Sequence, residues 1–147
     1  MEAAGEVAEV RRWVPAPLRR VARLLAGERM PLPAHLAERY PELADARWRR
    51  GGLFVRVGGW CLGRRSVAGI TLWRTVWIAR GVPLDPLLLL HELRHVHQFG
   101  ASPLFPLRYI WESLRRGYRG NRFEVDAVAF SHRRLLGTDP PTPPKER

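Results

Sequence analysis

The chain has 147 residues, a length that favours one domain and is sufficient to bury a hydrophobic core. Its single cysteine, Cys61, excludes an intramolecular disulfide, and no apolar stretch is long enough to span a bilayer. The net charge of +11 comes almost entirely from arginine, which raises the question of a nucleic-acid or anionic-surface partner. Because the arginines are spread along the chain, we favour a simple compositional bias. No apolar signal core precedes Val14, so the cytoplasm is the expected location.

The N-terminal third predicts two short helices. Residues 17–27 place apolar side chains on one side of a helix and arginines mostly off it, with Gly27 as the C-terminal stop. We expect this helix to pack on its own domain; the alternative is that a basic amphipathic helix lies on a membrane. Residues 31–41 predict a proline-started helical turn that ends before Pro41.

The middle of the chain changes to a pattern typical of short antiparallel strands. Four segments are rich in β-branched and aromatic residues and are separated by glycine or charge: 53–57, 61–65, 66–73 and 74–79. Trp73, Trp77 and Ile78 are expected to supply bulk to the core.

Three helices are predicted after the strands. Asp85 is a suitable N-cap for a helix over 86–99, with Gly100 as its stop. A second helix over 103–116 has an apolar side made by Leu104, Leu107, Ile110, Trp111 and Leu114. After a turn at 117–120, Asn121 caps a last helix that reaches Leu136. The sequence therefore predicts a single α+β domain over 1–136, with a small antiparallel sheet packed on the 86–99 helix and the two following helices. The proline-rich tail, 137–147, is expected to be disordered.

The first of these helices carries an HExxH motif, His91-Glu92-Leu93-Arg94-His95. At about 100° per residue, His95 lies about 40° from His91, so both imidazoles project from one side. Two such histidines can bind one zinc ion, with Glu92 placed to hold a water on it. His97 points away from His91 and is expected to support the site from outside or to lie on the surface. The opposite side of the helix is apolar, through Leu89, Leu90, Leu93 and Val96.

A third ligand is expected from a later element. The candidates are Glu112, Glu124, Asp126 and His132. Glu124 falls within the arc that Phe123, Ala127 and Phe130 form on the last helix, whereas Asp126 lies at its edge, where pairing to arginine is expected. A buried carboxylate is costly unless it is paired or bound to metal, which makes Glu124 the predicted third ligand. The alternative is a buried ion pair with an arginine such as Arg119.

Three further residues are candidates for a supporting role. Tyr118, His132 and Asp126 could hold the ligands from outside or donate a hydrogen bond to a transition state.

The sequence His91-Glu-Leu-Arg-His95-Val-His-Gln98, followed by Tyr118-Arg-Gly-Asn-Arg-Phe-Glu124-Val-Asp-Ala127, resembles the bacterial zincin-like domains of the DUF4157 type. It is similar, more distantly, to the gluzincin metallopeptidases. The resemblance covers residues 67–130 and implies a minimal zincin-like fold, zinc on His91, His95 and Glu124, and Glu92 as base. The chain departs from the pattern at Arg122, where proline is expected, and at Val128, where many gluzincins carry an aspartate that supports the ligands.

Together these observations predict a zinc-dependent, metallopeptidase-like hydrolase acting on a peptide or protein. A zinc-bound water activated by Glu92 would cleave the peptide bond. A strand within 71–79 could bind an extended substrate by edge pairing. Two alternatives remain: a catalytically weak or inactive zinc-stabilised interaction module, and a basic binder of nucleic acid or an anionic surface. The last is not favoured, because no nucleic-acid motif is present.

Overall fold

The computed structural model describes residues 17, 21, 24–53, 55 and 67–138. The elements run in the order β1 (Glu28–Arg29), α3 (Ala34–Arg39), the 3-10 helix η1 (Pro41–Asp45), β2 (Arg47–Arg50), β3 (Gly69–Leu72), β4 (Thr75–Ile78), α5 (Pro86–Ala101), α6 (Phe105–Gly120) and α7 (Arg122–Leu136). The expected α+β class is confirmed.

The four-stranded sheet has the order β1-β2-β4-β3 and is mixed. β2 runs parallel to β4, so the expectation of a purely antiparallel sheet is wrong for this pair. A parallel pair requires a long crossover, which the chain provides between β2 and β4. The strand expected over 53–57 is not found at its described residues, because Leu53 and Val55 are helical. The strand expected over 61–65 lies outside the described residues.

Strand β2 was not predicted, because its sequence, RWRR, alternates charge with a single aromatic residue. Trp48 is buried and its indole N–H donates to Leu43 O at 2.8 Å. Arg49 donates to Ala26 O at 3.0 Å and Arg50 donates to Val82 O at 2.7 Å. Main-chain carbonyls thus satisfy the guanidinium groups, which lets a charged strand lie inside the sheet.

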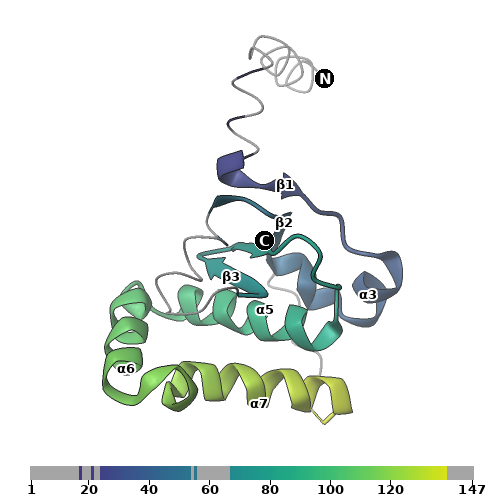
Figure 1. The fold of residues 1–147 in the computed structure, drawn as a ribbon. Coiled ribbons are helices and arrows are strands. Elements are labelled where there is room, and N and C mark those ends of the chain that lie inside the picture. The colour runs from purple at the N-terminus through teal and green to yellow at the C-terminus, as the bar shows by residue number, and fades with distance from the viewer. Residues whose placement is uncertain (1–16, 18–20, 22–23, 54, 56–66, 139–147) are drawn as a thin grey trace, which may run out of the picture.

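Helix α5 lies between the sheet and α7, and α6 closes one end of this layered arrangement (Figure 1). The helix begins as predicted, with the Asp85 carboxylate accepting from Leu87 N at 2.9 Å. It ends at Ala101, one residue past the expected stop at Gly100. The apolar side of α5 enters the main core, which comprises Leu36, Tyr40, Leu43, Ala46, Trp48, Val76, Ile78, Leu89, Leu90, Leu93, Val96 and Phe130. The side that carries the histidines is left to form a site.

Several apolar side chains do not lie in the core. Trp73, expected to supply core bulk, is 65% exposed in the turn between β3 and β4, whereas Trp77 and Ile78 are buried. The predicted apolar side of α6 is exposed, and Phe105, Tyr109 and Glu112 face inward instead. Gly117, with φ 71°, interrupts α6 at the predicted turn.

Part of the first predicted helix is described. Pro17, Val21 and Leu24–Ala26 are helical, and Gly27 ends the helix with φ 70°. Val21, Leu24 and Leu25 are exposed, so these side chains do not pack on the domain as expected. Of the tail, residues 139–147 lie outside the described part.

Candidate metal centre

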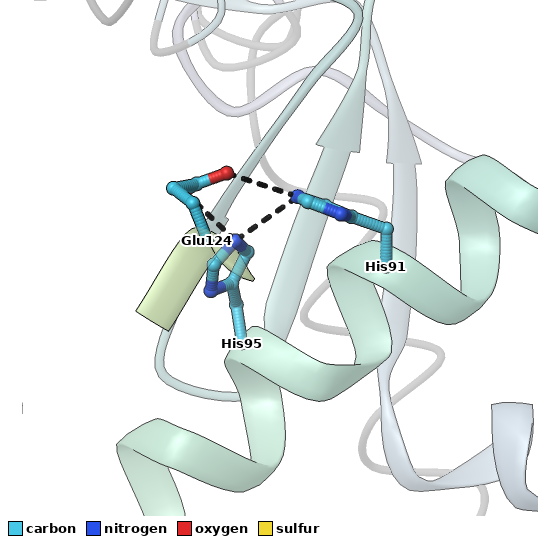
Figure 2. Close-up of side chains that lie close together, drawn as sticks. All are labelled: His91, His95 and Glu124. Carbon is cyan, nitrogen blue, oxygen red and sulfur yellow. Dashed lines mark hydrogen bonds and ion pairs between the residues drawn. The ribbon is translucent and has the colours of Figure 1, made fainter. Parts of the chain in front are cut away.

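Three side chains from two helices converge at one point. His91 and His95 come from α5 and Glu124 from α7, and the three point toward one another (Figure 2). His91 Nε2 lies 3.3 Å from Glu124 Oε2, and His95 Nε2 lies 3.2 Å from Glu124 Oε1. The two Nε2 atoms are 3.2 Å apart. We call His91, His95 and Glu124 the three-ligand cluster.

The spacing of the two histidines can be compared with the geometry of a tetrahedral metal site. Zinc binds imidazole nitrogen at roughly 2.0–2.1 Å, so two ligand atoms at a tetrahedral angle lie about 3.3 Å apart. The two imidazole nitrogens, 3.2 Å apart, match this edge length. Each of them also lies 3.2–3.3 Å from a carboxylate oxygen of Glu124, His91 from Oε2 and His95 from Oε1. The cluster therefore has donor atoms that could hold a metal ion, and they lie within 4.8 Å of one another.

The hydrogen bonds of Gln98 define the tautomer of His95. The Gln98 amide nitrogen donates to Phe123 O at 3.1 Å and to Asp126 Oδ2 at 2.8 Å. The amide oxygen therefore faces His95 Nδ1, at 2.8 Å, and Nδ1 is the donor. A neutral His95 then directs the lone pair of Nε2 at the Glu124 carboxylate. Two acceptors this close need a proton or a cation between them, which is the environment of a metal ligand.

The pKa values of the cluster also favour a positive charge between the histidines and Glu124. Burial opposes the charge on Glu124, but hydrogen bonds from His91 and His95 hold its pKa well below the ordinary value. Burial likewise opposes an imidazolium at His95, yet the hydrogen bond to Glu124 and the charges of Glu92 and Glu124 raise its pKa. The site thus concentrates negative charge that attracts a proton or a metal cation.

Tyr109 on α6 is a site residue that the sequence did not indicate. Its hydroxyl donates to Glu124 Oε1 at 2.6 Å, and its ring lies edge-on to His95 with centroids 6.0 Å apart. Burial, together with the charge of Glu124, raises the pKa of Tyr109, so it remains a donor. The sequence pattern placed it on the polar side of this helix, opposite the predicted apolar side, and so gave no sign that it enters the site.

Glu92 is 5% exposed and lies between α5 and the sheet. Thr71 on β3 donates its hydroxyl to Glu92 Oε2 at 2.6 Å. Gly69 lies against the same carboxylate, because a Cβ at this position would be 2.9 Å from Glu92 Oε1. A small residue on β3 is therefore needed where the carboxylate approaches the strand.

Asp126 forms the arginine pair that its position on the helix predicted. Arg94 donates to both carboxylate oxygens, at 2.7 and 3.2 Å. Burial works against its charge, but these bonds and that from Gln98 lower the pKa of Asp126. Asp126 also holds Gln98, which contacts His95. It therefore supports a ligand from outside, a role that Val128, 46% exposed, does not perform.

The remaining candidates lie outside the cluster. Glu112 pairs with Arg116 and Arg122 at 3.5 and 3.7 Å. His97 faces Asp45 at 3.4 Å, as its direction on the helix predicted. His132 contacts the carbonyl of its own helix at Val128, at 2.9 Å.

The cluster opens into a groove of about 1330 Å³ that both His132 and Tyr118 line. One wall is strand β3, and others are formed by Phe99, Phe105 and Ile110. Among the described strands, β3 pairs only with β4, and all four of its residues line the groove.

No protein-family model, curated protein or solved structure matches this chain. The resemblance to DUF4157-type domains thus rests on the motif residues. Within the part of the chain that the structure describes, no helix is long and apolar enough to cross a membrane.

Proposed function

We propose that this protein is a zinc-dependent hydrolase that cleaves peptide bonds. The observation that carries the proposal is the convergence of His91, His95 and Glu124 beside Glu92, in a groove walled by an edge strand. Structural zinc sites have four protein ligands, whereas catalytic ones have three and an open position. Among the residues that the structure describes, three ligand side chains meet within 4.8 Å of one another, and the groove gives access to them.

Bound zinc supplies Lewis acidity, which lowers the pKa of water towards about 7 and polarises a carbonyl. Glu92 has the role of general base. The Thr71 hydroxyl holds Oε2, and Oε1 is the atom that takes the proton of the attacking water and passes it to the leaving amine. Tyr109 and Gln98 keep the ligands in position. The Tyr109 hydroxyl donates to Glu124, and the Gln98 amide oxygen accepts from His95.

The substrate binds along β3. An extended peptide can pair with the edge of a sheet through main-chain hydrogen bonds, which recognise no particular side chain. β3 and Glu92 line the same groove, so a peptide paired with β3 has its scissile carbonyl near the cluster. Apolar walls at Phe99 and Ile110 favour apolar substrate side chains.

The test combines metal analysis with cleavage of a mixture of unstructured peptides, with new termini read by mass spectrometry. His91→Ala and Glu124→Ala are expected to lose stoichiometric zinc, whereas His97→Ala, a matched histidine on the same helix, retains it. Glu92→Gln is expected to keep zinc and lose hydrolysis by roughly 10²-fold or more. Full zinc in both ligand variants, or unchanged hydrolysis in Glu92→Gln, would refute the assignment.

A second candidate is a non-catalytic, zinc-stabilised module. It is favoured by the origin of the ligands, since His95 and Glu124 lie on α5 and α7 and a metal would join the two helices. In that case chelation lowers the melting temperature, and wild-type protein and Glu92→Gln are alike in every assay.

A further inference from the structure

Helix α6 exposes a continuous apolar surface. Leu107 is 67% exposed, Trp111 63% and Leu114 79%, and Ile110 and the preceding Leu104 are more than half exposed. We call these five residues the α6 face. At about 100° per residue they occupy an arc of about 120°, so they form one stripe along the helix. A solvated stripe of large apolar side chains is typical of an interaction surface.

The exposed charges that α6 itself places beside the α6 face have one sign. Arg108 and Arg115 follow the stripe on one border, at about 20–40° beyond it, and both are exposed. α6, all of which the structure describes, carries one acidic residue, Glu112, on its buried side. That carboxylate pairs with Arg116 and Arg122. The exposed part of the helix is therefore apolar and cationic, with no carboxylate.

This charge pattern discriminates between possible occupants. A second copy of the chain would bring Arg108 and Arg115 near their own counterparts, with no exposed carboxylate on α6 to pair them. An anionic lipid surface supplies phosphates for the arginines and an acyl boundary for the leucines. Trp111 fits the interface between the two, because its ring is apolar and its N–H is polar.

We propose that the α6 face binds an anionic bilayer surface, with the helix in the plane of the interface. The opposite border of the face meets the groove, because Ile110 belongs to both. The docked protein therefore opens its groove beside the lipid headgroups. The proposal is independent of peptide hydrolysis and of zinc.

The test is co-sedimentation of the full chain with vesicles of phosphatidylcholine containing phosphatidylglycerol, compared with phosphatidylcholine alone. We expect binding to the anionic vesicles only, weakening as salt is raised. Arg108→Gln/Arg115→Gln is expected to weaken binding roughly thirtyfold, from about 1 kcal/mol for each basic residue at an anionic surface. Leu107→Gln/Trp111→Gln/Leu114→Gln is expected to weaken binding at least ~100-fold.

Matched control variants distinguish binding through the α6 face from non-specific hydrophobic or electrostatic adsorption. Leu136, 78% exposed, lies at the end of α7 away from α6 (Figure 1), and Leu136→Gln should bind as wild type, whereas Leu114→Gln should not. Arg29→Gln/Arg47→Gln removes the same charge from the sheet and should have a smaller effect than the α6 pair. Glu92→Gln should bind vesicles normally, so failure of the proposed catalysis does not affect this result.

Four outcomes overturn the proposal: no binding to anionic vesicles at low salt, equal binding to both vesicle types, binding unchanged by the triple substitution, or a dimer that the triple substitution dissociates without vesicle binding. Melting curves confirm that each variant is folded, which is expected because the substituted side chains are exposed.

Discussion

Gln98→Leu tests whether the ligand geometry depends on residues outside the cluster. Gln98 is 8% exposed. Its side chain makes three hydrogen bonds, to His95 Nδ1, Phe123 O and Asp126 Oδ2. Leucine has a similar volume, so the substitution removes the hydrogen bonds with little change in packing. His95 then lacks the acceptor that fixes its tautomer and the orientation of its ring.

Loss of such a supporting partner typically weakens metal binding about 10–100-fold, which corresponds to about 1.4–2.7 kcal/mol. The metal-free protein should also lose about 1–3 kcal/mol of stability, because Phe123 O and His95 Nδ1 are left without their partners. Asp126 keeps its two bonds from Arg94 and should add little to this loss.

Zinc affinity is measured by competition with a chromogenic chelator, and stability by thermal melting with and without that chelator. His97→Ala is the matched control, since it alters the same helix on the side that faces Asp45. An affinity for zinc within twofold of wild type in Gln98→Leu would show that His95 is held without this bond and that our reasoning is wrong.

The remaining predictions concern the base, the protonation of the metal-free cluster and the packing of α7. Gly69→Ala places a Cβ 2.9 Å from Glu92 Oε1 and should lower hydrolysis at least ~tenfold at unchanged zinc content, measured by peptide cleavage and metal analysis. Without metal, the lowered pKa of Glu124 stabilises the fold above its ordinary value of 4.5, an effect lost as pH falls through the folded pKa. The raised pKa of His95 stabilises the fold below 6.5, an effect lost as pH rises through the folded pKa. Without metal, the contribution of the cluster to the melting temperature should therefore be largest between pH 4.5 and 6.5. With zinc, this contribution should be largest at higher pH, where the ligands are deprotonated. A metal-free contribution that keeps rising above pH 6.5 would contradict this prediction. Arg134 on α7 donates to both carboxylate oxygens of the buried Glu42 on η1. Arg134→Leu leaves Glu42 unpaired and should cost about 3–5 kcal/mol by denaturant unfolding; a loss below about 1 kcal/mol would contradict the buried pair.

The parts of the site that the sequence predicted are those governed by local periodicity. The spacing of His91 and His95 places both on one side of a helix whatever that helix packs against. Glu124 could be singled out because burying a carboxylate on the inward side of an amphipathic helix costs free energy unless a cation or a metal pairs with it. Each of these positions follows from the periodicity of a single helix. The structure brings the three side chains together.

The parts that the sequence did not predict depend on contacts between distant segments. Strand β2 forms because carbonyls of other segments accept from Arg49 and Arg50, and nothing in the local pattern shows those acceptors. Tyr109 joins the site because α6 turns its nominally polar side inward. Amphipathicity predicted the opposite orientation, since it assumes that the apolar side of a helix is the buried one.

That assumption fails for α6 in a way that bears on both proposals. The inward side of the helix is occupied by Tyr109, whose hydroxyl serves Glu124, and by Glu112, whose charge is held by two arginines. Together with the buried Phe105, these contacts are made on the inward side of α6, and Leu107 and Trp111 lie outside. Because the polar side of α6 is held in the site, its apolar side must face outward. That side then either stays in contact with water or is covered by a second surface. The orientation that completes the candidate metal centre is thus the same one that creates the α6 face.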